Sequence, residues 1–502
     1  MNSRLILHLA LVLGGGLFGC SRTPLDQANN PEPKPPVAFE YRTVGAKEPM
    51  HMERQRHVAA NCGGGRVAIF GGFANRGAEL FEVASQTFRE LRYDRVMGDF
   101  TGIALADGRV LLVDGVQDCV YDPAIEKLLP AKNAFTDQQV RWAQLLRLPD
   151  GKVFVCGGFD RDFKPVAGCA LFDPRTDSFE MIGKLTVPRA GHTISLINDH
   201  EVLVAGGTGA DYLKVSFDTL EIFNLTTRKA KLLEVRLNYP RANHFAVTLR
   251  DGQILFGGGY CHDQGEEVGH TAEVFDPLAR KMSVVGKLAL GRGEPEAIRL
   301  PSGRVAVFGG ADNIRAVEVY DPGQRKFALA GQLMIDPRRS GFTATPLDTG
   351  EVLLVGGGCN STKEDLDRVE IFSEHKYQQT GPARQTVEVK ARPRLPNPDP
   401  EVQSQAETVL QGIRGGQADH WCVEIWRDTR RIETLWFRDH PVEPYKDEKD
   451  ECFSKLRAAI DKSGGGELRV RFPSGFPYVK QVQLFNHIGW LRTPVVYLGA
   501  PL

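Results

Sequence analysis

The stretch PRANHFAVTLRDGQILFGGG (residues 240–259) contains the pattern that decides the fold. Its first half alternates apolar and polar residues, as in a half-buried β-strand. The Asp251–Gly252 pair that follows is a strong hairpin signal. Its second half is a nearly continuous apolar run that ends in glycines, as expected of a strand buried on both faces. The stretch therefore predicts two paired strands.

The second half of this stretch recurs along the chain, and successive copies begin 43 to 52 residues apart. The seven copies are RVAIFGG (66–72), RVLLVDG (109–115), KVFVCGG (152–158), EVLVAGG (201–207), QILFGGG (253–259), RVAVFGG (304–310) and EVLLVGG (351–357). A third strand such as EVFDP (273–277) and a fourth such as KFALAG (326–331) follow. Four short strands repeated at this period predict an all-β fold, the β-propeller.

The units resemble kelch repeats, which combine a glycine pair, an aromatic-Asp-Pro turn and a Pro-Arg-x-x-His strand start. The resemblance covers about residues 39–385 and implies a kelch-type propeller over residues 38–385. The second unit departs from the pattern at Asp114, which replaces the first glycine, and the last unit has Ser373 in place of Asp.

Seven copies predict seven blades, and six blades with a separate hairpin are the alternative. Two segments, AFEYRTV (38–44) and HKYQQTG (375–381), read as the strand that completes the last blade. We expect the N-terminal segment to take this place and to close the ring.

The chain begins with an apolar segment that is too short to span a bilayer, so residues 1–19 read as a secretory signal. Its Leu-Phe-Gly-Cys ending resembles a bacterial lipobox, which implies a lipid on Cys20; a plain secretory signal is the alternative. Residues 20–37 are Pro-rich and read as a tether. By resemblance to Gram-negative lipoproteins, Ser21 favours the outer membrane. We expect an exported protein anchored to the cell envelope by its lipid.

A second Pro-rich stretch, residues 386–401, separates the propeller from residues 402–502, for which we predict a small α+β domain. Its expected helices are 402–416 and 449–466, and its expected strands are 420–426, 431–437, 467–472 and 478–485. We recognise no family in this region.

The charges of the chain are balanced, with 62 Lys and Arg against 63 Asp and Glu. No excess of positive charge steers the protein to nucleic acid, so we expect no such partner, and we expect a monomer.

Two cysteine pairs are candidate disulfides, because an exported protein meets an oxidising compartment. They are Cys156 with Cys169, in a hairpin that sets Phe154 opposite Leu171, and Cys422 with Cys452. Two buried thiols are the alternative for the first pair. The remaining cysteines show no CxxC spacing, and we predict neither a metal site nor a cofactor.

Loops that follow the glycine pairs and loops that lead into the next blade share one face of a propeller, where binding is expected. The richest of these loops, residues 259–270, contains the candidate ligand residues Tyr260, His262, Asp263, Glu266 and His270. Such groups bind metals or transfer protons, and a solvated acidic loop is the alternative.

The strand starts provide a second candidate set where they depart from the repeat. These candidates are Arg141, Trp142, Arg292, Glu294 and Glu296. The Arg and His residues that match the repeat (Arg56 with His57, Arg189 with His192, Arg241 with His244) are expected to be structural.

These patterns favour a non-catalytic scaffold that binds a protein or a glycan. An exported carbohydrate-active enzyme, similar to sialic-acid mutarotases, is the alternative. Copper-radical oxidases with kelch-like propellers require an adjacent Tyr-His pair, and the sequence contains none.

Overall fold

The computed structural model describes residues 37–72, 77–93, 100–136, 139–209, 215–261, 267–310, 314–334, 340–359, 364–365, 367–378, 420–427, 430–438, 458, 467–471 and 495–497. Within these ranges the chain is almost entirely β-structure, and its one short helix is α1 (Glu267–His270). In the described part of the chain no helix has the length and apolar character needed to cross a membrane.

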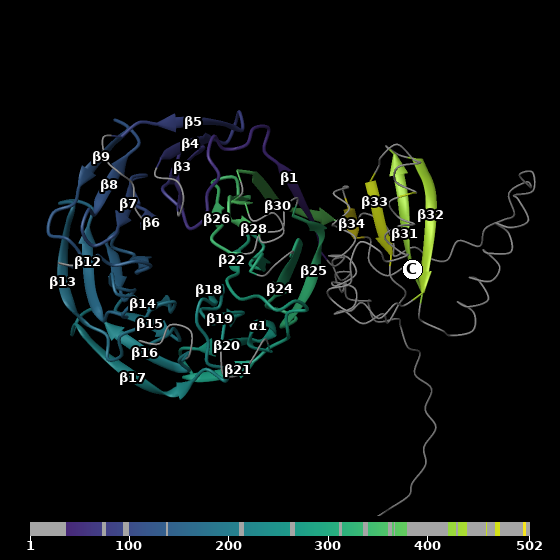
Figure 1. Ribbon diagram of the computed structural model, residues 1–502. Helices are drawn as coiled ribbons and strands as arrows, with labels where there is room; N and C mark the ends of the chain where they lie inside the picture. The colour runs from purple at the N-terminus through teal and green to yellow at the C-terminus, as the bar shows by residue number, and fades with distance from the viewer. Residues whose placement is uncertain are drawn as a thin grey trace, which may run out of the picture.

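Seven four-stranded antiparallel blades surround a central axis (Figure 1). The first strand of each blade contacts the first strand of the next, and the first strand of blade seven contacts that of blade one. The ring is therefore closed, and the prediction of a seven-bladed β-propeller is confirmed.

Blades one to six each use four consecutive strands, with the first at the axis and the fourth at the rim. Those of blades one to three are β2 (Val58–Gly63), β3 (Arg66–Phe70), β4 (Ala78–Glu82) and β5 (Thr87–Leu91); β6 (Thr101–Ala104), β7 (Val110–Val113), β8 (Cys119–Asp122) and β9 (Lys127–Pro130); and β10 (Gln144–Arg147), β11 (Val153–Cys156), β12 (Gly168–Asp173) and β13 (Ser178–Lys184). Those of blades four to six are β14 (Thr193–Asn198), β15 (Glu201–Ala205), β16 (Thr219–Asn224) and β17 (Lys229–Arg236); β18 (Phe245–Thr248), β19 (Ile254–Gly257), β20 (Ala272–Asp276) and β21 (Lys281–Val284); and β22 (Glu296–Arg299), β23 (Val305–Phe308), β24 (Ala316–Asp321) and β25 (Lys326–Leu333).

Blade seven combines both ends of the ring sequence. It consists of β26 (Thr343–Pro346), β27 (Val352–Val355), β30 (Val369–Gln378) and, at the rim, β1 (Val37–Gly45). Strand β1 pairs antiparallel with β30, with Val37 opposite Gln378 and Gly45 opposite Glu370. The expected closure by the N-terminal strand is thus confirmed, whereas residues 375–378 simply continue β30. A small hairpin of β28 (Gly358–Cys359) and β29 (Glu364–Asp365) lies between β27 and β30.

The described C-terminal strands extend the sheet of blade six. They are β31 (His420–Arg427), β32 (Arg430–Arg438), β33 (Glu467–Arg471) and β34 (Val495–Tyr497). Strand β34 pairs with the rim strand β25, where Val496 lies opposite Gln332. The expected strands at 420–426, 431–437 and 467–472 are present, and β34 was not expected. The expected strand at 478–485 and both expected helices lie outside the described residues, apart from the single helical residue 458.

Buried Arg–Glu ion pairs recur around the ring, each within one blade, next to the boundary with the preceding blade. The pairs and their N–O distances are Arg54–Glu79 (3.1 Å), Arg189–Glu221 (2.8 Å), Arg241–Glu273 (2.9 Å) and Arg292–Glu318 (3.0 Å), with all eight side chains fully buried. Burial lowers the pKa of Arg54, Arg189 and Arg241, because it penalises the charged form, while the paired carboxylate opposes this effect.

The geometry of Arg241 shows how each pair joins two blades. The carbonyl oxygen of Arg241 accepts a hydrogen bond from Gly207 N of blade four at 2.9 Å. Its guanidinium donates to Gly258 O at 2.6 Å and to Glu273 Oε1 at 2.9 Å, both in blade five. Arg241 therefore links the two blades, because its backbone bonds to blade four and its side chain bonds inside blade five.

Blade three lacks both partners of this pair. Val140 occupies the arginine position, four residues before the axial strand, and Ala170 occupies the glutamate position on the third strand. Both side chains are buried in the apolar cluster between blades two and three. In blade three, apolar residues therefore replace both the arginine and the glutamate of the ion pair, so neither charge is left without its partner.

Asp114, the departure in the second unit, also has a structural explanation. Its Oδ1 accepts hydrogen bonds from Val116 N at 2.8 Å and Gln117 N at 2.6 Å, so it caps the turn that glycines form elsewhere. The neighbouring Asp118 accepts from Asp114 N and from Phe135 N. The blade keeps its place in the ring with a different turn.

We predict that an Arg–Glu pair tolerates joint but not single replacement. Arg241→Val should lower the free energy of unfolding by about 3–5 kcal/mol, because it leaves the Glu273 carboxylate buried without its partner. The double variant Arg241→Val, Glu273→Ala, which copies blade three, should recover much of this loss. Urea unfolding followed by circular dichroism measures the effect. A double variant at least as unstable as Arg241→Val would contradict the prediction.

Candidate functional site at the axis

The backbone position two residues before the axial strand is described in six blades, and in five of these it adopts a left-handed conformation. The residues and φ angles are Arg56 (55°), Trp142 (56°), Gly191 (59°), Asn243 (52°) and Gly341 (67°). In blade six the same position is Glu294. Because these residues lead into strands at the axis, their side chains gather at one mouth of the central channel.

Four of these side chains contact one another, and we call them the axial cluster. Nη2 of Arg56 lies 3.4 Å from each carboxylate oxygen of Glu294. Asn243 Nδ2 donates to Glu294 Oε1 at 3.2 Å. The Arg56 guanidinium also lies over the Trp142 ring, 4.9 Å from its centroid. The cluster joins blades one, three, five and six, which can meet only at the axis.

The backbone of the axial cluster indicates that its side chains are retained for their contacts. A left-handed conformation is natural for glycine, tolerable for asparagine and unfavourable for larger residues by roughly 1–2 kcal/mol. Gly191 and Gly341 fill the position without strain. Arg56 and Trp142 occupy it at a conformational cost, as is common at binding sites.

Tyr260 is the one candidate of the 259–270 loop that the structure brings to this mouth. Its ring lies directly over Gly293, next to Glu294, and 44% of the residue is exposed. His270 is placed differently, since its Nδ1 lies 3.2 Å from Leu288 O and its ring packs against Gly291. The candidates His262, Asp263 and Glu266 lie outside the described residues.

An aromatic group extends outward from Trp142. The Trp142 ring lies edge-on to Phe159 at a centroid distance of 6.0 Å and next to Phe163 at 6.4 Å. Phe163 is 44% exposed, and the Arg141 guanidinium lies 5.3 Å from its ring centroid. Arg141 and Trp142, both expected from the sequence, thus form a rim of cations on aromatic faces.

Arg292 does not belong to the mouth. It is fully buried, donates to Gly309 O at 2.7 Å and Ala316 O at 2.9 Å, and forms the ion pair with Glu318. It is the repeat arginine of blade six, and its donors are engaged inside the ring. The sequence interpretation of Arg292 as a ligand residue is therefore corrected by the structure.

The opposite correction applies to Arg56. The sequence interpretation gave Arg56 the structural role of the repeat, but Arg54 holds that position through its pair with Glu79. The spacing could have shown this, because Arg54 precedes His57 by three residues, as Arg189 precedes His192. Asn243 was missed because it lies within a segment that otherwise matches the repeat.

The histidines of the repeat are structural, as the pattern indicates. His57 Nε2 lies 3.1 Å from Thr343 Oγ1, and His244 Nε2 lies 2.9 Å from Thr193 Oγ1, in both cases across a blade interface. Burial, and secondly Arg189, lowers the pKa of His192 to about 3. Burial also lowers the pKa of His244, so the imidazoles of His192 and His244 are neutral near pH 7.

Glu296, the first residue of β22, carries the most strongly perturbed carboxyl near the mouth. Burial, reinforced by the charge of Glu294, raises the pKa of Glu296 to about 7. It begins the axial strand two residues after Glu294. A carboxyl with this pKa exchanges its proton near neutral pH.

Cys156 and Cys169 face each other in the expected register, with Phe154 opposite Leu171. Gly157 N donates to Gly168 O, so the cysteine pair is a non-hydrogen-bonded pair, whose side chains approach most closely. Both are fully buried free thiols in this structure. Their disulfide stays a prediction, and that of Cys422 with Cys452 lies outside the described side chains.

Comparison with known proteins agrees with this architecture. The chain is 27% identical over 219 residues to an F-box/kelch-repeat protein of Arabidopsis thaliana, a match that covers 40% of this chain and 45% of that protein. The ring is a kelch-type β-propeller. The chain spans less than half the length of this curated relative. No family model matches the chain.

The kelch-type propeller is also similar to a solved structure, a fungal alcohol oxidase of the AA5 family in complex with copper. The TM-score is 0.53 at 15% identity, over 67% of this chain and 76% of the oxidase chain. This likeness concerns the fold alone. In the described part of this chain, no three His, Cys, Asp or Glu side chains are grouped as a metal ion would require.

We predict that Glu296 makes the stability of the kelch-type propeller depend on pH. Because its folded pKa of about 7 lies above the ordinary value of 4.5, the folded state holds a proton that the unfolded state releases. Stability should therefore fall as pH rises from 5 to 8, by roughly 1–3 kcal/mol. Glu296→Gln should remove this dependence, measured as the urea midpoint across the pH range. An unchanged pH dependence would contradict the prediction.

Proposed function

We propose that this protein is a lipid-anchored envelope protein whose kelch-type propeller binds a protein or a glycan at the axial mouth, without catalysis. The observation that carries the proposal is the axial cluster. Arg56 and Trp142 occupy a strained backbone position that glycine fills in blades four and seven.

The chemistry of the mouth suits a polar ligand. Arg56 and Asn243 supply hydrogen-bond donors, Glu294 supplies acceptors, and the Trp142 and Tyr260 rings supply faces for stacking. The distance of 3.4 Å between Arg56 and Glu294 is long for a charge-assisted hydrogen bond, so a ligand can replace it at little cost. Few polar groups among aromatic faces are typical of ligand sites.

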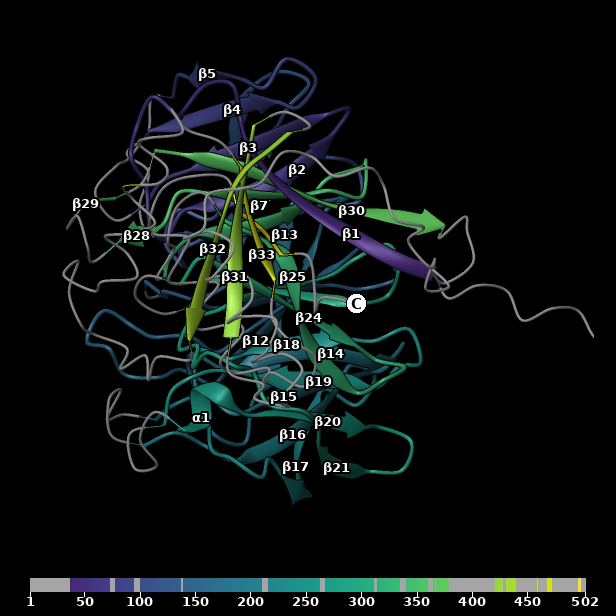
Figure 2. The ribbon, with the colours of Figure 1, turned by 90° about the vertical axis from the view of Figure 1, so that its right-hand side faces the viewer.

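The position of the N-terminal strand supports an anchored orientation. Val37, the first residue of β1, pairs with Gln378 at the end of β30. Figure 2 shows this end of β1 on the right, whereas α1 and β28, on the face of the mouth, lie on the left. A tether that ends at residue 37 would therefore hold the ring with its mouth directed away from the membrane.

Glu296 favours a second candidate function, an exported carbohydrate-active enzyme of the sialic-acid mutarotase type. Its pKa of about 7 suits a group that accepts and returns a proton near neutral pH. Glu294, two residues away, pairs with Arg56 at 3.4 Å.

Binding at the axial mouth can be tested with the chain from residue 37, which keeps every described strand. Trp142→Gly and Glu294→Gln should each weaken by tenfold or more the binding found by glycan array or pull-down. Arg89→Gln, on an exposed ion pair of the rim strand β5, is the control. Replacement of residues 261–266 by a Gly-Ser turn tests the adjoining loop. Equal binding by Trp142→Gly, Glu294→Gln and the unmodified chain would contradict the proposed site.

The non-catalytic character of the protein has its own test. We expect no stoichiometric copper, zinc or iron in the purified protein by elemental analysis, and no conversion of sugar anomers followed by NMR. Anomer exchange that is lost in Glu296→Gln would favour the second function instead.

The lipid anchor predicts incorporation of radioactive palmitate in the bacterial host. Labelling should be lost in Cys20→Ala, because this residue supplies the modified thiol. Equal labelling of Cys20→Ala and the unmodified chain would contradict the anchor. That result would not bear on binding at the axial mouth, which is tested separately.

A further inference from the structure

The turns between the third and fourth strands of blades four, five and six share one sequence feature. Each ends in an Arg-Lys pair, and the three pairs are Arg228–Lys229, Arg280–Lys281 and Arg325–Lys326. All six side chains are exposed. Because the three blades are consecutive, these cations form one arc along the rim, which we call the basic arc (Figure 1).

The cations of the basic arc are only partly neutralised. Arg228 pairs with Glu180 at 2.6 Å and Arg280 with Glu201 at 3.5 Å, and both pairs are exposed. The structure gives no ion pair within the described residues to the other four cations of the arc. The same turns also contain Asp276 and Asp321, of which Asp321 pairs with Arg304. The six cations of the arc therefore exceed the carboxylates of these turns and of the two ion pairs.

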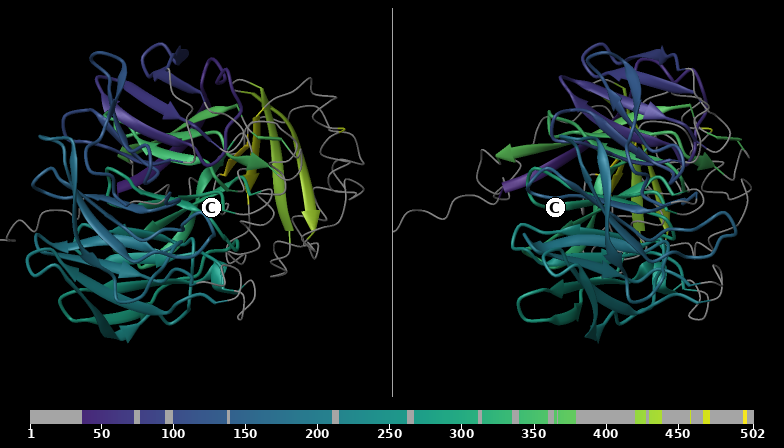
Figure 3. Two further views of the ribbon diagram at one scale, coloured as in Figure 1. Left: turned by 60° about the vertical axis from the view of Figure 1, so that its left-hand side comes forward. Right: turned by 90° about the vertical axis from the view of Figure 1, so that its left-hand side faces the viewer.

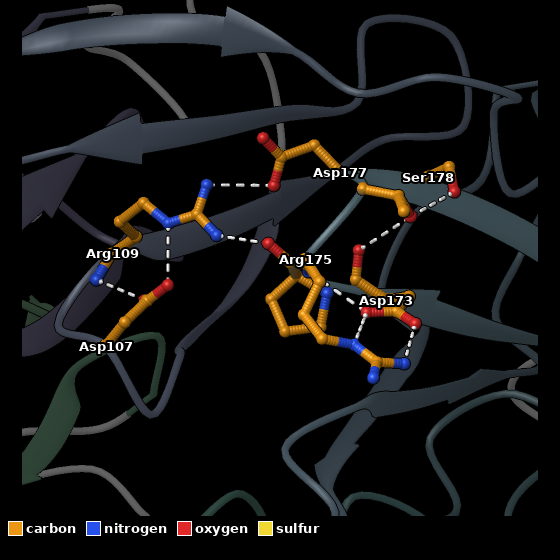
Figure 4. Close-up of polar contacts among 8 residues, drawn as sticks. Asp107, Arg109, Asp173, Arg175, Asp177 and Ser178 are labelled. Atoms are coloured by element: carbon orange, nitrogen blue, oxygen red, sulfur yellow. Dashed lines mark hydrogen bonds and ion pairs between the residues drawn. The ribbon is translucent and has the colours of Figure 1, made fainter.

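The corresponding region of blades two and three is different (Figure 4). There Arg109 lies between Asp107 and Asp177, each at 2.8 Å, and Arg175 pairs with Asp173 at 2.6 Å. Arginine and aspartate neutralise one another on this side of the ring. An excess of cations in the turns between the third and fourth strands is therefore a feature of blades four, five and six, and not of blades two and three.

An exposed leucine lies in the middle of the arc. Leu278, in the turn of blade five, is 94% exposed, and Arg280 follows it by two residues. Asp276 precedes Leu278 by two residues and accepts a hydrogen bond from its backbone N. An isolated exposed leucine needs no explanation, but an exposed apolar tip followed by two cations suits a surface that meets a membrane.

The arc lies on the face from which a tether would leave the ring. Strand β30 ends in Gln378 on this face, as β16, β20 and β24 end in the turns of the arc, and Val37 pairs with Gln378. The right view of Figure 3 shows the ring from the side opposite to Figure 2, with β1 and the end of β30 now on the left. Blade seven, which contains Val37, is the neighbour of blade six, so the arc and the tether point lie close along the rim.

We propose that the basic arc is a docking surface for anionic lipid headgroups. The proposal of a lipid partner rests on the lipid anchor proposed above, because a lipid on Cys20 would bring this face to a membrane. Each Lys or Arg close to an anionic bilayer contributes attraction that salt screens, and Leu278 enters the headgroup region. The lipid on Cys20 and the basic arc together hold this face of the ring against the membrane, and the axial mouth then faces away from it.

The experiment uses the chain from residue 37, which has no lipid, and vesicles of phosphatidylcholine with or without phosphatidylglycerol. We expect cosedimentation with the anionic vesicles alone, and loss of binding at high salt. Arg280→Gln with Lys281→Gln should weaken binding about tenfold. Arg161→Gln with Lys164→Gln removes the same charge from an exposed loop near the axial mouth and should leave binding unchanged. Circular dichroism checks the fold of both variants.

The proposal is overturned by three results. The first is the absence of binding to the anionic vesicles, and the second is equal binding to both vesicle types. The third is an equal loss of vesicle affinity in the arc variant (Arg280→Gln with Lys281→Gln) and the loop variant (Arg161→Gln with Lys164→Gln). A surface that prefers duplex DNA to vesicles in a competition assay would also overturn it. These outcomes are independent of the palmitate test, since the chain from residue 37 lacks Cys20. Absence of vesicle binding thus refutes the arc, whereas equal labelling of Cys20→Ala refutes the anchor.

Discussion

The ring depends on the buried ion pair between an arginine that precedes an axial strand and a glutamate on the third strand of the same blade. Two charges out of water cost more than their attraction returns unless good geometry and further hydrogen bonds compensate. Arg241 has such bonds at both terminal nitrogens, which donate to Glu273 and to backbone carbonyls of its own blade, while its carbonyl oxygen accepts a hydrogen bond from the preceding blade. Apolar contacts hold any two blades together, but these directed bonds set their relative position.

A scaffold fixed in this way leaves the axial position free to vary. Two residues after the repeat arginine, the chain turns through a left-handed residue whose side chain has no structural task. Glycine occupies it in two blades, whereas Arg56, Trp142 and Asn243 occupy it in three others. The chemistry of the mouth can therefore change without disturbing the ring, which is how one fold comes to serve unrelated ligands.

The sequence predicts the scaffold better than the site, for physical reasons that particular residues illustrate. Glycine pairs and hairpin turns are local signals, so the repeat and its strands follow from them. The sequence left six blades as an alternative to seven and left the closing strand open, and the pairing of β1 with β30 in the structure decides both. The ion pairs are not local, yet the replacement of both partners by Val140 and Ala170 in one unit was visible in the sequence. The meeting of Arg56 with Glu294 depends on ring curvature, and no spacing along the chain encodes it. Arg292 was misassigned although the repeat spacing places it at the buried arginine position, because the residues that follow it, Glu294 and Glu296, depart from the repeat.

Closure of the last blade by β1 has a consequence for how the chain folds. Val37 and Gln378 belong to opposite ends of the ring sequence, and they pair only after every intervening blade is present. Contacts between such distant residues form slowly, because a long loop must be ordered first. Until then β1 and the outer edge of β30, whose other edge pairs with β27, are exposed strand edges that can join other chains.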